Sequence, residues 1–98
     1  MKTRIAVNAS SGKMGQQVIN QTISHDDAEL IAAFCRPNHR LLGRTVSLTD
    51  VVYSNDVDKG LQQTDVVIDF SLPEGTLQLI DNALKTNTPI LIGTTGFS

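Results

Sequence analysis

The chain has 98 residues, of which 40% are hydrophobic and 18% are charged, and its formal net charge is −2 at pH 7. These values predict one compact domain with a single core and leave no room for a second domain. The few Lys and Arg residues are scattered, which excludes the basic stripe that binds nucleic acid. Asn8 interrupts the first apolar run, so neither a signal peptide nor a membrane span is predicted, and we expect a cytoplasmic protein.

Short apolar segments alternate with helical patterns from the start of the chain. Residues 4–8 predict a strand and residues 12–24 predict an amphipathic helix. Residues 28–35 predict a second strand because they are continuously apolar, although their alanines leave a helix as an alternative. The single cysteine, Cys35, can form no internal disulfide, which agrees with a reducing compartment.

The second half of the chain repeats this alternation. Residues 36–50 predict a loop, followed by a short strand at 51–54 and a short helix at 56–62. Two further buried strands are predicted at 65–70 and 89–95 because both segments are strongly apolar.

A longer helix is predicted between these last two strands. Ser71 is a suitable N-cap, Pro73 fits the first turn, and Glu74 stands at the capping-box spacing from Ser71. The apolar face predicted for this helix consists of Leu77, Ile80, Ala83 and Leu84.

Together these elements predict the α/β fold class, with a doubly wound, mostly parallel, Rossmann-like sheet in one domain, residues 1–98. Continuously apolar strands of this kind are expected to be covered on both faces. With the strand order 3-2-1-4-5, ligands are expected outside the carboxyl ends of the strands, where the order reverses.

The segment "NASSGKMG" joins the first strand to the first helix. Its spacing Ala9-x-x-Gly12-x-x-Gly15 departs from the G-x-G-x-x-G pattern at Ala9. Gly12 is suited to close approach of the backbone to a phosphate, and Gly15 is suited to close packing of the helix on the strand. A tight strand-to-helix turn without any ligand is the alternative interpretation of the two glycines.

Three polar residues in this segment favour an anion. Ser10 and Ser11 supply hydroxyl donors and a possible N-cap. Lys13 places a cation in the first helical turn, where it opposes the helix dipole unless an anion lies nearby.

The residues after the second strand indicate which ribose is bound. Dinucleotide sites often carry an acid there for the ribose hydroxyls, but Cys35 occupies the position and Arg36 follows it. Lack of the acid and presence of the base favour a phosphorylated ribose. An exposed loop arginine without a ligand is the alternative for Arg36.

The last two strands end in segments that would flank the rest of a dinucleotide. Phe70 ends one strand and Ser71 follows it, and Gly93, Thr94 and Thr95 close the other strand. Ordinary strand termination remains an alternative for each threonine alone.

No other constellation of reactive residues stands out. His25 and His39 have no metal-ligand spacing with each other or with Cys35, so no metal site is predicted. Asp69 is the one carboxyl group expected to be buried, and a structural hydrogen-bond acceptor is the favoured role for it.

Three motifs, "SGKMG", "IDFSLPEGTL" and "IGTTGF", resemble those of the 4-hydroxy-tetrahydrodipicolinate reductase family, also called dihydrodipicolinate reductases, of the lysine (diaminopimelate) pathway. The resemblance spans the whole chain and implies binding of NADPH or NADH. It carries cofactor binding over to Ala9, Ser10, Ser11, Gly12, Lys13, Met14, Cys35, Arg36, Gly93, Thr94 and Thr95. Two positions depart from the family pattern: Ala9 replaces a glycine, and Cys35 stands where an acid is common.

Members of this family carry a second domain with the catalytic and substrate-binding residues, and that domain has no counterpart in these residues. The resemblance therefore implies an amino-terminal cofactor domain that binds the dinucleotide without turnover and holds no catalytic residue. It also implies that the full-length protein is an oxidoreductase and a homo-oligomer. A stand-alone nucleotide- or CoA-binding module without catalysis is the alternative.

Overall fold

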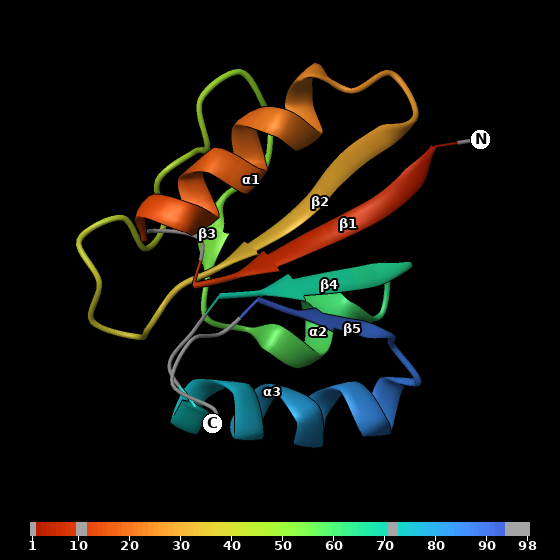
Figure 1. Cartoon of the computed structure of the whole chain (residues 1–98). Helices are drawn as coiled ribbons and strands as arrows, with labels where there is room; N and C mark the ends of the chain where they lie inside the picture. Colours follow the sequence, from red (N-terminus) through yellow and green to blue (C-terminus); the bar gives the residue numbers. More distant parts are fainter. Residues whose placement is uncertain (1, 10–11, 71–72, 94–98) are drawn as a thin grey trace.

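The protein, described here by a computed structural model over residues 2–9, 12–70 and 73–93, is a parallel sheet with helices on both sides (Figure 1). The described strands are β1 (Thr3–Asn8), β2 (Ala28–Phe34), β3 (Tyr53–Ser54), β4 (Val66–Asp69) and β5 (Ile90–Ile92). The described helices are α1 (Lys13–Ser24), α2 (Val57–Leu61) and α3 (Pro73–Thr86). The five strands are ordered β3-β2-β1-β4-β5 and all pair in parallel, which confirms the predicted fold class and strand order.

The alanine-rich segment of β2 is a strand, not the alternative helix. It lies between β1 and β3 in the sheet, and its last three residues are buried. Ile5 pairs with Leu30 whereas Ala6 pairs with Ala32, so Ile31 is an extra residue in β2. This bulge turns Ile31 and Ala32 toward the same side of the sheet, where both pack in one cluster.

Helix α3 buries Ala83, as the sequence predicts, but not Leu77 or Leu84. Leu77 and Leu84 are 61% and 72% exposed, while Leu79 and Ala83 are 2% and 4% exposed. The prediction was therefore wrong for both exposed leucines. The sequence pattern misleads because Thr76, a polar residue, begins the buried face and is itself 0% exposed. A helix face defined by residues 76, 79 and 83 follows the i, i+3, i+7 spacing.

The end of α3 is set by Asn87. Its φ of +55° is left-handed, which asparagine tolerates better than most residues. The Thr88 amide then donates to the Ala83 carbonyl at 3.0 Å, which is the outer bond of a Schellman motif. The chain thereby turns back toward the sheet and enters β5.

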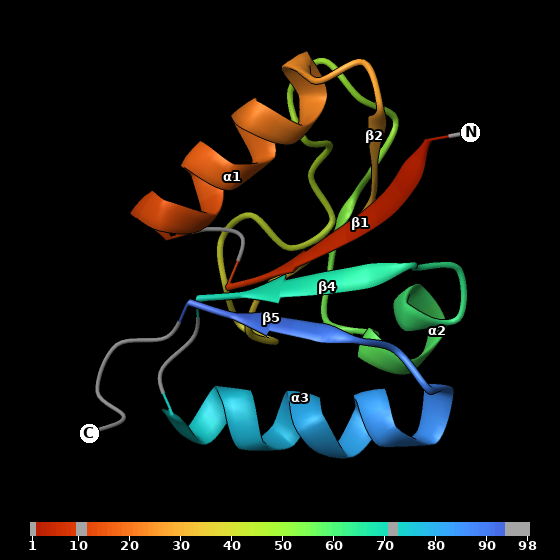
Figure 2. The same cartoon turned by 45° about the vertical axis from the view of Figure 1, so that its right-hand side comes forward.

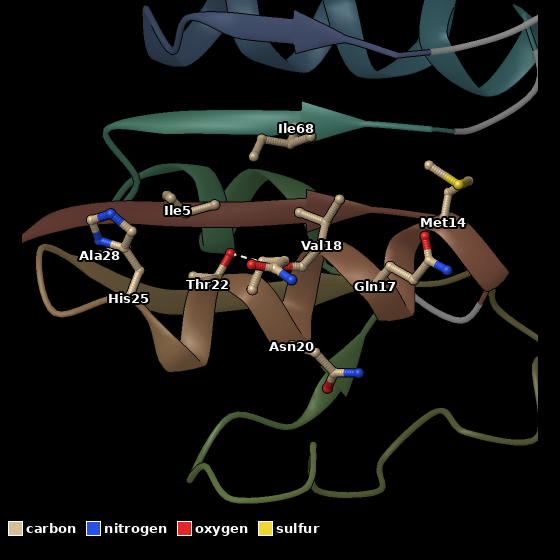
Figure 3. Close-up of a pocket in the computed structure, with 10 residues that line it drawn as sticks. Ile5, Met14, Gln17, Val18, Asn20, Thr22, His25, Ala28 and Ile68 are labelled. Carbon is tan, nitrogen blue, oxygen red and sulfur yellow. Dashed lines mark hydrogen bonds between the residues drawn. The ribbon is translucent and has the colours of Figure 1, made fainter.

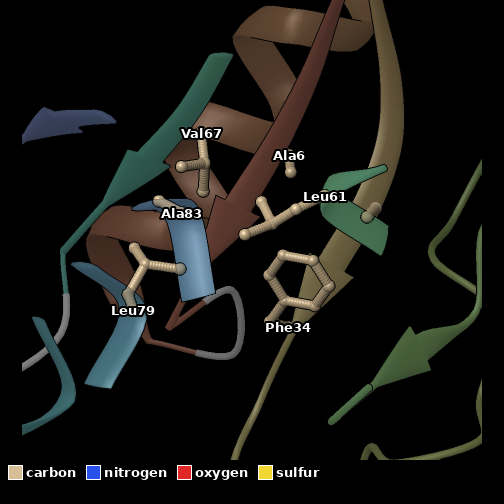
Figure 4. Packing of buried hydrophobic residues seen from close by; sticks show 7 residues of the cluster. Ala6, Phe34, Leu61, Val67, Leu79 and Ala83 are labelled. Atoms are coloured by element: carbon tan, nitrogen blue, oxygen red, sulfur yellow. The ribbon is translucent and has the colours of Figure 1, made fainter. Parts of the chain in front are cut away.

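One hydrophobic cluster lies between the sheet and the helices α2 and α3 (Figure 4). Its buried members are Ala6, Ala32, Phe34, Leu61, Val67, Leu79 and Ala83. The Phe34 ring lies so close to α2 that a Cβ on Gly60 would come within 2.5 Å of it. Glycine at this position therefore allows α2 to approach the sheet.

A second cluster lies under α1 on the opposite side of the sheet. Its buried members are Val7, Ile19, Leu30, Ala33, Cys35, Val46 and Tyr53. Alternate residues of β1, Ala6 and Val7, contribute to the two clusters, as expected for a strand with two covered faces. The Gln16 side chain donates to the Tyr53 hydroxyl at 2.7 Å and so ties α1 to β3.

The expectation of cover on both faces is wrong for the outer strand. Among the described helices, only α1 lies on the side of the sheet opposite α3, and it runs over β1 and β2 (Figure 2). Leu91 of β5 faces that side, because its neighbour Ile90 packs in the cluster on the α3 side, and Leu91 is 61% exposed. Within the described ranges, no helix has both the length and the hydropathy needed to cross a membrane.

An ion pair joins the amino-terminal halves of the two central strands. The Arg4 side chain lies 3.2 Å from Asp65, and the Arg4 backbone amide donates to the same carboxylate at 2.8 Å. The backbone hydrogen bond from Arg4, followed by the side-chain bond, holds the pKa of Asp65 below its ordinary value. Both side chains remain nearly half exposed.

The corrected face of α3 is tested by a matched pair of substitutions. Leu79→Ala should lower the free energy of unfolding by about 2–5 kcal/mol because it leaves a cavity in the core. Leu84→Ala should change it by less than about 0.5 kcal/mol because Leu84 is in solvent. Urea unfolding measures both values, and similar losses for the two variants would contradict the observed face.

The Arg4–Asp65 contact predicts an acid-sensitive contribution to stability. Because the folded pKa of Asp65 is lowered, this contribution is complete above the unfolded pKa of about 3.9 and is lost as the pH falls through the folded value. The urea midpoint of the unsubstituted chain should therefore exceed that of Asp65→Asn near neutrality, and the gap should shrink below about pH 4. A constant gap throughout the acid range would contradict this role.

Candidate functional site

Four neighbouring strands end in one row at the carboxyl edge of the sheet. In order across the sheet, the paired residues of this row are Phe34, Asn8, Asp69 and Ile92. The residues that follow them are Cys35, Ala9, Phe70 and Gly93. Parts of the chain as far apart as Asn8 and Ile92 are thus brought to one edge, which is the edge where the sequence predicts a ligand.

The turn from Ala9 to Gly12, called the glycine loop below, begins with an unusual backbone conformation. Ala9 has a φ of +58°, a left-handed value that glycine adopts more easily than alanine. The Gly12 amide donates to the Ala9 carbonyl at 3.2 Å and closes the turn. The turn therefore accepts the Cβ that distinguishes this chain from the G-x-G-x-x-G pattern.

The folded chain does not require a glycine at position 12. Gly12 has a φ of −75° and a ψ of 170°, which are extended values that any residue adopts. Among the described residues, a Cβ built on it would meet one atom, the Ala9 carbonyl oxygen, at an ordinary contact distance of 3.5 Å. The described residues therefore leave space over Gly12, and a side chain there would occupy that space.

The first turn of α1 offers amide groups to an anion. The helix begins at Lys13, so the amides of its first residues have no partner within the helix. Gly12 holds the N-cap position without a side-chain hydrogen bond, which corrects the expectation of a serine N-cap. No acidic side chain lies in this turn, while Lys13 and Met14 are both exposed. Ser10 and Ser11 lie outside the described residues.

The two residues after β2 lie in different environments. Cys35 is 7% exposed and packs in the cluster under α1, where burial raises the pKa of its thiol. Its backbone amide donates to the Ser54 carbonyl at 2.9 Å. Arg36 is exposed, so its guanidinium is available at the carboxyl edge. A cofactor contact through the Cys35 side chain is not favoured by this packing.

The ends of β4 and β5 meet through an aromatic ring. A Cβ on Gly93 would lie 2.2 Å from the Phe70 ring, so glycine is required for the ring to lie where it does. The Gly93 amide donates to the Asp69 carbonyl at 2.7 Å, and the Phe70 amide reaches the Asn8 carbonyl at 3.5 Å. The other residues predicted here, Ser71, Thr94 and Thr95, lie outside the described residues.

Asp69 joins three elements at the centre of this edge. It is 0% exposed, and its carboxyl oxygens accept hydrogen bonds from the Asn8 side-chain amide at 3.0 Å and from the Thr76 hydroxyl. Its predicted role as a structural acceptor is confirmed. Asn8 and Thr76 were not predicted as functional residues. The available signals were a polar residue ending an apolar strand and a threonine one turn into the helix that follows Asp69.

A groove of about 620 Å³ lies along the uncovered part of the sheet, beside α1 (Figure 3). Its lining includes Ile5, Val18 and Ile68, which are apolar, and it extends from Met14 to His25. The described residues that line it include no Asp, Glu, Lys or Arg. The groove runs along the face of the sheet, whereas the glycine loop and Phe70 lie at the edge, so it is separate from the predicted anion site except at Met14.

The histidines serve local turns. The Nδ1 atom of His25 accepts a hydrogen bond from the backbone amide of Asp27 at 3.1 Å. In the same way, Nδ1 of His39 accepts one from the amide of Leu41 at 3.1 Å. Within the described ranges, no group of three or more His, Cys, Asp or Glu side chains could hold a metal ion.

Comparison with known proteins identifies similar sequences. A sequence model of the family described as "Dihydrodipicolinate reductase, N-terminus" matches residues 3–98. The chain is 39% identical over 99 residues to the 4-hydroxy-tetrahydrodipicolinate reductase of Paraburkholderia phymatum, covering 96% of this chain and 37% of that protein. It is 42% identical over 100 residues to the protein of the same name from Dechloromonas aromatica, covering 97% of this chain and 37% of the relative.

A solved structure agrees in fold. The chain superposes on "Dipicolinate bound Dihydrodipicolinate reductase from Paenisporosarcina sp. TG-14" with a TM-score of 0.80 and 24% sequence identity, over 100% of this chain and 39% of the other. At this identity the similarity shows the fold alone. The chain therefore spans little more than a third of the length of these relatives, 37% in both curated proteins named above.

Proposed function

This chain belongs to the family of dihydrodipicolinate reductase amino-terminal domains, and on that premise we propose that it binds a nicotinamide dinucleotide at the carboxyl edge of its sheet. The whole protein is proposed to be an NAD(P)H-dependent 4-hydroxy-tetrahydrodipicolinate reductase of lysine biosynthesis, the name that its relatives carry. The observation that carries the proposal is the space that the described residues leave over Gly12 at the start of α1, in a row of four strand ends.

The residues present fit such a cofactor. The pyrophosphate would lie against the glycine loop, on the amides of Gly12 and the first residues of α1, with Lys13 beside it. Arg36 would face the adenosine ribose, since β2 neighbours β1 in the sheet. Phe70 and Gly93 would flank the nicotinamide end. The other residues proposed to bind the cofactor are Met14, the backbone of Cys35, and Ser10, Ser11, Ser71, Thr94 and Thr95.

The nicotinamide, when bound, supplies a hydride to the acceptor. This chain's own contribution is to bind and orient the cofactor, because the described strand ends at Phe70 and Gly93 carry no His, Lys or Tyr side chain to donate a proton. We propose that the 98-residue chain binds without turnover and that acceptor binding requires the rest of the protein. Cytoplasmic location and homo-oligomerisation of the whole protein are part of the same proposal.

Substitution of Gly12 tests the pyrophosphate site. Gly12→Val should stay folded, because its backbone angles suit valine, yet it should weaken NADPH and NADH binding by about tenfold or more, equal to about 1.4 kcal/mol, by filling the space over the loop. Gly12→Ala should lose less affinity. Calorimetric titration measures the affinities and urea unfolding checks the fold.

The same titrations include CoA as a competing ligand. Unchanged dinucleotide affinity in folded Gly12→Val would refute the loop assignment. Tight binding of CoA without binding of either dinucleotide would favour the non-catalytic module and refute the reductase proposal.

Arg36 is proposed to favour NADPH over NADH. A charge-assisted hydrogen bond to the 2′-phosphate is worth about 1.5–3 kcal/mol when desolvated, and exposure of Arg36 reduces this value. Arg36→Ala should therefore weaken NADPH binding by roughly tenfold and leave NADH nearly unchanged. Arg44→Ala, which removes the same charge from another exposed position of the following loop, is the matched control. Equal losses for both cofactors would show that Arg36 does not contact the phosphate.

A further inference from the structure

The buried carboxyl group of Asp69 stands directly behind the glycine loop. Asn8 is the last residue of β1, and its backbone leads into the left-handed turn at Ala9. The Asn8 side chain donates to one carboxyl oxygen of Asp69 at 3.0 Å across the paired strands. The bond therefore holds the residue at which the glycine loop leaves the sheet.

The other contacts of Asp69 fix its own position. Its second carboxyl oxygen accepts a hydrogen bond from the hydroxyl of Thr76. Thr76 lies near the start of α3 and is 0% exposed. Its backbone carbonyl accepts the Gly93 amide at 2.7 Å at the end of β5. Asp69 is thus fixed to α3 on one side and to β5 on the other, and it presents its remaining oxygen to Asn8.

A wholly buried carboxyl group does not stabilise a hydrophobic core as well as an apolar side chain would. Burial of a polar side chain is unfavourable unless its hydrogen bonds are made, and an apolar residue would fill the same space without that requirement. Val67, two residues earlier on the same face of the strand and also 0% exposed, packs in the apolar cluster on the α3 side. The bonds of Asp69 join the elements that border the proposed cofactor, which gives the acid a role at the site.

We propose that Asp69 is a positioning residue for the dinucleotide, which acts through Asn8 to hold Ala9 and its hydrogen bond from the Gly12 amide in place. The proposal rests on the proposed cofactor function and adds to it two residues, Asp69 and Asn8, that need not touch the ligand. The turn needs such support because Ala9 holds a left-handed φ, which is unfavourable for a residue with a Cβ. Without the hydrogen bond from Asn8 to Asp69, the turn would open in the ligand-free chain. The Gly12 amide would then lose its hydrogen bond to the Ala9 carbonyl.

The first test measures the loop in the ligand-free chain. Asn8→Ala should raise the hydrogen-exchange rate of the Gly12 amide, which donates to Ala9 in the closed turn. Thr22→Val is the control, since Thr22 is also buried and its hydroxyl donates to the Val18 carbonyl at 2.8 Å, but it lies three turns along α1. This control should leave Gly12 exchange unchanged even where it lowers the free energy of unfolding. Equal exchange at Gly12 in Asn8→Ala and the unsubstituted chain would overturn the proposal.

The second test is a double-mutant cycle on NADPH affinity. Asn8→Ala alone should raise the dissociation constant about tenfold, but in the Gly12→Val background it should add less than about twofold, because the loop contact is already lost. Additive losses would overturn the proposal, since they would mean that Asn8 acts separately from the loop. The milder Asn8→Ser serves the same cycle if Asn8→Ala does not fold.

The two proposals fail in different ways. An unsubstituted chain that binds neither NADPH nor NADH refutes the cofactor function and the positioning role with it. Binding by the unsubstituted chain together with unchanged affinity in Asn8→Ala refutes the positioning role alone. A loss of affinity in Thr22→Val as large as in Asn8→Ala would also refute it, because general destabilisation would then explain both.

Discussion

The register in which β1 pairs with its two parallel neighbours is the constraint on which the other features of this protein depend. It aligns Phe34, Asn8 and Asp69 in one row, so that each strand leaves the sheet at the same edge. A slip of one residue would exchange the two faces of β1 and place Ala6 and Val7 in the wrong clusters. Packing on both faces therefore fixes the register, and the register in turn fixes the site.

Much of this arrangement could be predicted because its signals are local. Continuous apolar strands that alternate with amphipathic helices indicate a parallel sheet, and Gly12 with Lys13 indicates an anion at a helix start. The apolar face of α3 could not be predicted in the same way. It includes Thr76, which counts as polar in the sequence but donates its hydroxyl hydrogen bond inside the core to Asp69, seven residues earlier.

The remaining differences also come from contacts between distant segments. Cys35 was predicted to adjoin the ribose, but its side chain packs under α1 with Val46 and Tyr53 from the next segment of the chain. Whether α1 covers the outer strand β5 depends on where this helix crosses the sheet. The hydrophobic pattern of the sequence does not predict that position. Leu91 is exposed although it is apolar. An apolar residue in a strand therefore indicates that burial would be favourable, but it does not show that another element covers the strand.

The charge distribution at the sheet edge explains how a chain of net charge −2 can favour a phosphorylated ligand. The amides at the start of α1 and the exposed Lys13 contribute positive potential, with no acidic residue in that turn to offset it. Arg36 adds a second cation beside the neighbouring strand. Among the described residues of this edge, the acid is Asp69, and it is enclosed by hydrogen-bond donors and removed from solvent. The local field at the glycine loop is therefore set by donors and cations, and the net charge of the chain does not determine it.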